Sequence, residues 1–382
     1  MKKRILFVID NLTGGGAEKV LYDILRNIDL SKYNIELFLI ENKGVYKEKI
    51  KRLGININYL FNERKDLFKN ILYKKVKSMI IRVLKYFYFR YPFLIKKIKN
   101  KNYDIEIAFL EGYSTVLVAN RKNNSKKIAW VHTDLEKHRI LKKNLERKSY
   151  RKMNKIICVS ESSKKAILKL YPENKDKVEV IYNPIDKKNI INKSNKIVDY
   201  ESIYCDDKYK ILSIGRLNKQ KGYDILIKSF SKLIKAGLEC ELIILGEGPE
   251  RKNLEELLIE KKITDKIHLL GFKENPYPYL KNSDIFVSSS RYEGFSLVVA
   301  EAMCLGKAII STNCLGPSEI LKKGKYGVLV DVEDENDLFE KIKRMLLDKE
   351  LKKKYMKLSK KGSKIFDMDK VIKKIEDLLD EK

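Results

Sequence analysis

The sequence predicts an α/β protein with two doubly wound domains, each a parallel sheet with helices on both faces. Short apolar runs of strand length alternate with segments of helical period along the whole chain, as is typical of parallel sheets covered by helices. The chain has 382 residues, enough for two domains of roughly 150 residues with separate cores. Its 44% of apolar and 10% of aromatic residues exclude a disordered chain.

Twelve apolar runs are the expected strands. The first six are Ile5–Ile9, Ile35–Ile40, Ile105–Leu110, Ile128–Val131, Ile156–Val159 and Val178–Tyr182. The other six are Ile211–Ile214, Leu242–Leu245, Ile267–Leu270, Ile285–Val287, Ala308–Ile310 and Val328–Val330. Helical periodicity between the runs predicts crossover helices, among them Ala17–Ile28 and Ser162–Leu170.

Periodicity also indicates the domain boundaries. The polar segment Pro184–Lys210 has neither a strand nor a helix period, which is typical of a linker. We therefore expect a first domain at 1–184, a linker at 185–209 and a second domain at 210–365. Two helical stretches, Lys341–Lys361 and Asp369–Asp380, close the chain, and the segment 366–382 could pack back on the first domain.

The positive charge is concentrated in the first half of the chain. The net charge is +29, from 81 basic and 52 acidic residues. Residues 1–190 carry 44 basic and 20 acidic side chains, and residues 191–382 carry the remaining 37 and 32. Such a field attracts polyanions, so nucleic acid, an anionic membrane and phosphorylated substrates are all open as partners.

Cysteine usage and hydropathy predict a cytoplasmic protein. The five cysteines are odd in number, far apart and without a CxxC pair, which favours reduced thiols and no structural zinc. The apolar run Ile5–Ile9 is too short for the core of a signal peptide. The stretch Met79–Ile95 contains three basic residues, whereas a spanning helix needs about 20 mostly apolar ones. No segment is expected to cross a membrane.

A glycine-rich loop, Gly14-Gly15-Gly16, follows the first expected strand. Glycines let the backbone approach a ligand, and the N–H groups of the next helix favour an anion there. Lys19 stands where the dinucleotide fingerprint needs its third glycine. A plain tight turn remains open. So does a nicotinamide enzyme, because Glu41 at the end of the second strand could bind a ribose.

A second glycine loop, Gly215–Gly222, opens the second domain and adds Arg216 and Lys221. Arginine presents a rigid fork to phosphate oxygens and lysine a mobile point charge. Together they suit a diphosphate without a metal. The alternative is a solvated basic surface.

Two carboxylates flank a third strand-to-helix loop. Glu293 precedes a helix expected over Phe295–Leu305, and Glu301 lies two turns inside that apolar helix. A buried carboxylate is costly unless it is hydrogen-bonded, and ligand hydroxyls are natural partners. Alternatively, Glu293 is a helix cap and Glu301 a surface residue.

Taken in order, these motifs resemble glycosyltransferase family 4. The motifs are Gly14-Gly15-Gly16-Ala17-Glu18, Gly215-Arg216-Leu217 with Gln220-Lys221-Gly222, Leu245-Gly246-Glu247-Gly248-Pro249, and Glu293 and Glu301 with seven residues between them. The resemblance implies the GT-B fold, two Rossmann-like domains facing across a cleft. It also implies retaining transfer of a sugar from a nucleotide donor bound by the second domain to an acceptor bound by the first.

The resemblance further implies roles for single residues. Arg216 and Lys221 would bind the donor diphosphate, Glu293 the donor sugar and Glu301 the ribose. His132, after the strand Ile128–Val131, would lie near the donor sugar; a purely structural histidine is the alternative. Other donor contacts are expected from Gly15, Gly16, Phe272 in the loop Gly271–Asn275, the backbone of Phe295, Ser296 and Leu297, and Glu319. Family members often have a smaller residue than Ser296. No cofactor or metal is expected.

A basic and aromatic segment lies in the expected acceptor domain. Lys65–Lys101 holds 12 basic residues, eight aromatic residues and one acid, a composition suited to the interface between water and anionic lipid. We expect membrane docking through Lys74, Lys75, Lys77, Arg82, Lys85, Tyr86, Phe87, Phe89 and Arg90. An ordinary amphipathic helix and a surface that stacks single-stranded nucleic acid are the alternatives.

Three functions follow, in order of preference. The first is a retaining glycosyltransferase at the inner face of the cell membrane. It would move a sugar from a UDP-sugar to a lipid-diphosphate-linked saccharide in polysaccharide or glycolipid synthesis. The second is a sugar-nucleotide epimerase of the same fold. The third, a nucleic-acid-binding protein, leaves the spacing of Glu293 and Glu301 unexplained.

Overall fold

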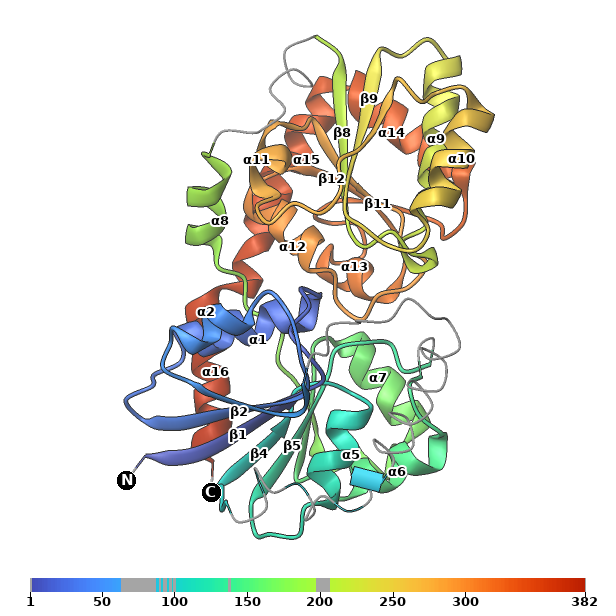
Figure 1. The fold of residues 1–382 in the computed structure, drawn as a ribbon. Helices are drawn as coiled ribbons and strands as arrows, with labels where there is room; N and C mark the ends of the chain where they lie inside the picture. The colour runs from blue at the N-terminus through green and yellow to red at the C-terminus, as the bar shows by residue number, and fades with distance from the viewer. Residues whose placement is uncertain are drawn as a thin grey trace. The chain divides into compact units, whose positions relative to one another are not determined.

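The computed structural model describes residues 2–62, 87–88, 91, 95, 98, 101–136, 139–196 and 207–381 (Figure 1). The chain divides into two compact units. Unit 1 comprises Met1–Pro184 and Val371–Lys382, and unit 2 comprises Ile185–Lys370. Each unit has its own parallel sheet and its own buried core.

Unit 1 contains a sheet of seven parallel strands in the order β3-β2-β1-β4-β5-β6-β7. The strands are β1 (Lys3–Ile9), β2 (Tyr33–Asn42), β3 (Asn56–Asn62), β4 (Ile105–Ala108), β5 (Lys126–Val131), β6 (Lys155–Cys158) and β7 (Val178–Val180). Strand order reverses between β1 and β4, which pair in register from Ile5 with Ile105. Loops that follow strands at such a switch point diverge and leave room for a ligand.

Helices connect the strands of this unit, and the first helix presents an apolar stripe to the core. The helices are α1 (Gly16–Asn27), α2 (Lys47–Lys51), α5 (Tyr113–Asn120), α6 (Lys143–Arg151) and α7 (Glu161–Leu170), with a 3₁₀ turn at Pro172–Lys177. In α1, Val20, Leu21, Ile24 and Leu25 are buried, the spacing expected of a helix with one core-facing side. Ser160 caps α7 by accepting the backbone N–H of Ser163, as serine does at helix starts.

Unit 2 has a six-stranded parallel sheet in the order β10-β9-β8-β11-β12-β13. The strands are β8 (Tyr209–Ile214), β9 (Cys240–Leu245), β10 (Ile267–Leu269), β11 (Ile285–Ser288), β12 (Ala308–Thr312) and β13 (Val328–Val330). The helices are α8 (Lys187–Ser194), α9 (Tyr223–Lys235), α10 (Arg251–Lys261), α11 (Tyr277–Asn282), α12 (Leu297–Cys304), α13 (Leu315–Ile320), α14 (Glu335–Leu347) and α15 (Lys349–Gly362), with 3₁₀ turns at Lys219–Lys221 and Ser363–Phe366. The twelve predicted strands are therefore confirmed.

Three segments differ from the sequence-based expectation. The strand β3 was not predicted, because its partly exposed edge position does not need a continuous apolar run. The predicted linker contains α8, capped by Asp186, and α8 belongs to unit 2. The helical stretch 341–361 is two helices that meet at Asp348, whose carboxylate accepts the backbone N–H of Leu351 and so starts a new helix.

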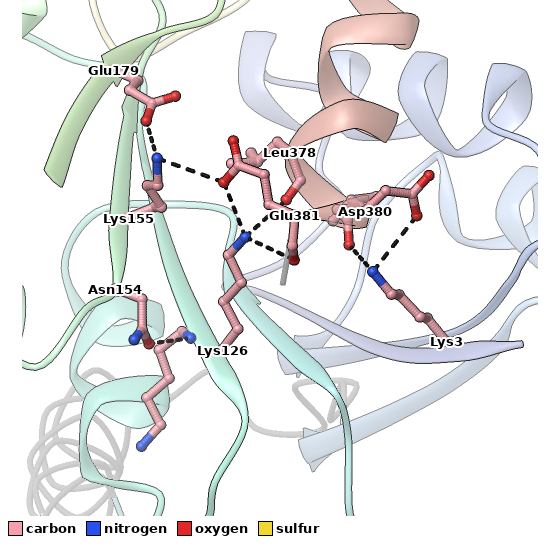
Figure 2. A network of polar contacts seen from close by, with 10 residues as sticks. Lys3, Lys126, Asn154, Lys155, Glu179, Leu378, Asp380 and Glu381 are labelled. Carbon is pink, nitrogen blue, oxygen red and sulfur yellow. Dashed lines mark hydrogen bonds and ion pairs between the residues drawn. The ribbon is translucent and has the colours of Figure 1, made fainter.

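The last helix, α16 (Met368–Asp380), returns to unit 1 from residue Val371 on. Figure 2 shows its end between lysines of three strands. Lys3 Nζ donates to the Leu379 carbonyl at 2.8 Å, and Lys126 Nζ donates to the Leu378 carbonyl at 3.1 Å. Cations are favourable at the negative end of a helix dipole, where carbonyls lack partners within the helix. The C-terminus is thus attached to the first sheet.

Replacing Leu379 by alanine is expected to destabilise the protein by about 3 kcal/mol, because its fully buried side chain would leave a cavity. Lys126→Ala should cost less than about 1 kcal/mol, because its ion-pair partner Glu381 is half exposed. Urea denaturation of both variants checks this. Equal losses of stability in the two variants would contradict the view that apolar packing is what mainly holds α16.

Candidate active site

Two loops of unit 2 converge at the carboxyl ends of neighbouring strands. β8 pairs with β11, so the loops that follow them start side by side. Ser289 Oγ donates to the carbonyl of Lys221 at 2.8 Å, and Gln220 Nε2 donates to the carbonyl of Tyr292 at 2.9 Å. The backbone N–H of Arg291 donates to the Gln220 carbonyl at 2.7 Å. These bonds fix the predicted diphosphate loop against the loop that carries Glu293.

Gly222 lies where the backbones of these two loops come close together. Gly222 has a φ of +61°, and a Cβ there would lie 2.2 Å from the carbonyl oxygen of Ser289. Any other residue would therefore push the two loops apart.

The structure brings Lys221 and Glu293 together. Lys221 Nζ forms a hydrogen-bonded ion pair with Glu293 Oε1, which also accepts Ser290 Oγ at 2.6 Å. The Glu293 side chain is 6% exposed. Glu293 lies in the loop before α12, and its carboxylate bonds to these two side chains. It is not the helix cap, because Ser296 occupies the N-cap position. A bound diphosphate would have to share or take over the Lys221 ammonium.

Arg216 is an exposed cation of the loop that carries Lys221. Its side chain is exposed, and it forms no hydrogen bond or ion pair with another residue in the part of the chain that the structure describes. A guanidinium without partners can turn toward an anion with little loss of existing contacts. Its place two residues after β8 puts it in the same loop as Lys221.

Glu301 is buried on α12, as the sequence predicted. It is 3% exposed, and its Oε1 accepts the hydroxyl of Tyr277 at 3.0 Å. The alternative of a surface position is wrong. Tyr277, on α11, is a residue that the sequence analysis missed, because a tyrosine carries no motif of its own.

The start of α12 leaves its capping groups unused. Ser296 is the N-cap residue, but its side chain accepts no backbone N–H, and its buried Oγ has no partner among the described residues. The first-turn N–H groups of α12 face no side-chain cap and can bind an anion.

Phe295 is nearly buried, Leu297 is half-buried and Phe272 is exposed. Glu319 lies half-buried on α13, whose Gly316 N–H donates to the Glu293 carbonyl at 3.0 Å.

Unit 1 carries the remaining predicted residues at the carboxyl edge of its sheet. Gly14 has a φ of +100°, and α1 starts at Gly16 with Gly15 as its N-cap. His132 follows β5, and its ring lies 4.9 Å from that of Phe109. Burial lowers the pKa of His132 to about 3, so the imidazole is neutral at pH 7.

Two carboxylates join this edge. Asp10, after β1, accepts Ser114 Oγ at 2.7 Å, and Glu111, after β4, accepts the backbone N–H of His132 at 2.9 Å. The sequence analysis did not single out Glu111. The signal was available, because Glu111 follows an expected strand and precedes a glycine, as other predicted site residues do.

Comparison with known proteins decides the family. Residues 14–189 match the model for Glycosyltransferase Family 4, and residues 202–364 match the model for glycosyl transferases group 1. A Campylobacter jejuni protein is 30% identical over 97% of both chains. Its name is N-acetylgalactosamine-N,N'-diacetylbacillosaminyl-diphospho-undecaprenol 4-alpha-N-acetylgalactosaminyltransferase. The chain belongs to glycosyltransferase family 4.

Further comparisons agree with this assignment. The Anabaena protein HepE, solved with UDP, superposes with a TM-score of 0.78 over 99% of both chains at 19% identity. A lipopolysaccharide core glycosyltransferase of Rhizobium meliloti is 30% identical over 37% of this chain and 41% of its own. The fold is GT-B, with two Rossmann-like domains.

Membership of this glycosyltransferase family favours sugar transfer over the epimerase, nicotinamide-enzyme and nucleic-acid-binding alternatives. Transfer from a nucleotide sugar leaves negative charge on the departing phosphate. Fixed cations and helix N–H groups stabilise such charge without moving during the reaction. Lys221, held by Glu293, and the start of α12 are groups of this kind, and Arg216 is an exposed cation of the same loop as Lys221. That transfer needs no metal or cofactor stays a prediction.

The predicted membrane-docking residues are only partly covered. Lys74, Lys75, Lys77, Arg82, Lys85, Tyr86, Phe89 and Arg90 lie outside the described residues. Phe87 is 50% exposed and its ring lies 5.3 Å from that of Tyr91, which is also exposed. Across the described ranges, we find no helix with the length and hydropathy that a membrane span requires.

Proposed function

We propose that this glycosyltransferase moves a sugar, with retention, from a UDP-sugar to a lipid-diphosphate-linked saccharide in cell-surface polysaccharide or glycolipid synthesis. The name of the Campylobacter jejuni relative specifies an acceptor on undecaprenol diphosphate. UDP is the ligand of the solved Anabaena structure. The basic first half of the chain suits an acceptor that carries a diphosphate at an anionic membrane.

The pairing of Lys221 with Glu293, in a site whose first loop also contains the exposed Arg216, carries this proposal. When the bond from the anomeric carbon to the phosphate oxygen breaks, both electrons stay on the diphosphate. Arg216 and Lys221 compensate that charge, and Glu293 accepts a hydroxyl of the sugar. The acceptor oxygen bonds to the anomeric carbon on the face that the phosphate leaves, and its proton passes to the departing phosphate.

A thermal-shift screen of nucleotides and sugar nucleotides tests the donor, because a ligand that binds only the folded state raises the melting temperature. The panel includes UDP, GDP, UDP-glucose and UDP-N-acetylgalactosamine. We expect UDP compounds to stabilise the protein, and Arg344→Ala, an exposed control on α14, to respond like the wild type. No response to any UDP compound would contradict the proposed donor.

A transfer assay with the selected donor and a synthetic undecaprenyl-diphosphate saccharide tests the reaction. NMR coupling of the new anomeric proton then shows the stereochemistry. An inverted product would contradict the retaining mechanism.

Membrane docking through the basic and aromatic segment is a separate prediction. Changing Lys74, Lys75, Lys77, Arg82 and Lys85 to glutamate should abolish co-sedimentation with vesicles that contain phosphatidylglycerol, since each nearby basic residue contributes about 1 kcal/mol. The matched control makes the same change at five exposed lysines of α15, namely Lys353, Lys354, Lys357, Lys360 and Lys361. Equal binding of both variants would contradict docking through this segment.

A further inference from the structure

The loop after β4 holds a buried carboxylate that none of the family motifs includes. Glu111 is 5% exposed and accepts the backbone N–H of His132. Glu106, also buried, is paired with Arg121. Glu111, in contrast, forms no ion pair with any described lysine or arginine. Backbone N–H groups, those of His132 and of Glu111 itself, take the place of a cation at this carboxylate.

The surroundings of Glu111 are acidic or neutral. Burial raises the pKa of Glu111 to about 7, against the lowering effect of the backbone hydrogen bonds from His132 and Glu111 itself. The carboxylates of Asp10, after β1, and Glu146, on α6, add smaller raising effects. Tyr150 on α6 and Cys158 on β6 also interact with it. Both are neutral at pH 7, because burial raises their pKa values well above the usual range. Glu111 therefore exchanges its proton near neutral pH.

His132 presents an unused acceptor beside Glu111. A hydrogen bond with the backbone of Phe109 engages the ring, while Nε2 is buried and has no partner in the described part of the chain. Since Nε2 has no partner, the hydrogen bond with the Phe109 backbone involves Nδ1. In a neutral ring Nδ1 then carries the proton, and Nε2 carries a lone pair. That atom can accept a hydrogen bond from a substrate hydroxyl.

We propose that Glu111 is a positioning residue, whose carboxylate fixes the main chain of His132 at the end of β5 and so sets where Nε2 meets a substrate hydroxyl. An ionised carboxylate accepts an N–H more strongly than a carboxylic acid does. The position of His132 therefore responds to the proton on Glu111. The effect on transfer rests on the proposed function, but the link between Glu111 and His132 does not.

Nuclear magnetic resonance of the protein alone tests the link. The chain has three histidines, so ¹⁵N-histidine labelling gives three imidazole signals, and His132→Asn assigns one of them. We expect the His132 nitrogens to keep the shifts of a neutral ring and to move slightly with a midpoint near pH 7. Glu111→Gln should remove that movement. Glu146→Gln, the matched control, should only lower the midpoint, because one neighbouring negative charge is gone.

Thermal melting checks the proton on Glu111 and the integrity of the variants. The folded pKa of about 7 lies above the ordinary value of 4.5, so the folded state binds this proton more tightly than the unfolded state does. Its stabilising effect is full below about pH 4.5 and is lost as the pH rises through 7. Glu111→Gln should therefore melt above the wild type at pH 8 and near it at pH 4.5. A lower melting temperature at pH 8 would overturn the proposal.

The transfer assay tests the consequence for the reaction. Glu111→Ala should lower kcat roughly ten- to hundredfold through misplacement of His132, with the donor KM changed less than about twofold. Glu111→Gln retains an accepting oxygen and should recover most of the rate at pH 8, while flattening the pH dependence around 7. Wild-type kcat in Glu111→Ala, or a His132 midpoint that persists in Glu111→Gln, would overturn the proposal. Absence of transfer by the wild type would instead count against the proposed function.

Discussion

Replacing Arg216 by alanine is expected to lower kcat for sugar transfer about 10²- to 10³-fold, because removing one donor to a developing anion costs that much. Stability should change by less than about 0.5 kcal/mol, since the exposed side chain has no partner among the described residues. Steady-state kinetics and urea denaturation of the same preparation check both. Arg216→Lys keeps the charge without the fork and should recover only part of the rate.

Lys221→Ala is the informative comparison. It would leave the Glu293 carboxylate buried without its cation, so this variant should lose stability as well as rate. The double variant Lys221→Ala with Glu293→Gln should regain stability but not activity. If Arg216→Ala retains the wild-type rate, the diphosphate is stabilised elsewhere and the proposed site is wrong.

Replacing Arg121 by leucine is expected to destabilise unit 1 by about 3–5 kcal/mol, because it leaves a buried carboxylate unpaired. Arg121 Nε contacts Glu106 Oε1 at 2.7 Å, and the Glu106 side chain is fully buried. The guanidinium also donates to the carbonyls of Ile98 and Lys101 at 3.0 and 3.2 Å. The loss should appear as a lower denaturation midpoint in urea.

A second substitution separates the ion pair from local packing. Adding Glu106→Gln to Arg121→Leu removes the unpaired charge and should recover a large part of the lost stability. Lys155→Leu is the surface control, because the carboxylate of its partner Glu179 is 43% exposed; it should cost less than about 1 kcal/mol. Equal losses of stability in Arg121→Leu and Lys155→Leu would show that breaking the buried Glu106 pair costs no more than breaking an exposed pair.

The strands were predictable because buried parallel strands need continuous apolar runs. β8, β9 and β12 are buried along nearly their whole length, so apolar composition alone locates them. β3 has asparagine at three of its seven positions and pairs only with β2. An edge strand of this kind tolerates polar side chains, and its sequence does not distinguish it from a loop.

Helix ends were less predictable, because they depend on single contacts that hydrophobic periodicity does not reveal. The break at Asp348 follows from one carboxylate bonding to one N–H, and 341–361 is otherwise periodic throughout. Likewise, Glu293 and Glu301 have a regular spacing, yet only Glu301 lies on α12.

Part of the candidate site was predictable from the position of its residues after expected strands. Arg216, Lys221 and Glu293 lie in loops after strands, and parallel strands bring those loops to one edge of a sheet. The contact between Lys221 and Glu293 joins residues 72 positions apart, so it required the folded backbone. Glu111 contacts a backbone N–H of His132. Its place after a strand and before a glycine marks it as a candidate, but the contact itself appears only in the folded chain.

The division of unit 1 between the two ends of the chain has a consequence for synthesis on the ribosome. The strands β1 to β7 are complete by Val180, whereas the helix that packs on them begins its return at Val371. Unit 2 is translated entirely within that interval. Domains commonly fold in the order in which they emerge, but here the first sheet lacks this helix until the segment from Val371 on has been synthesised. The packing of unit 1 is therefore completed only after the whole of unit 2 has been synthesised.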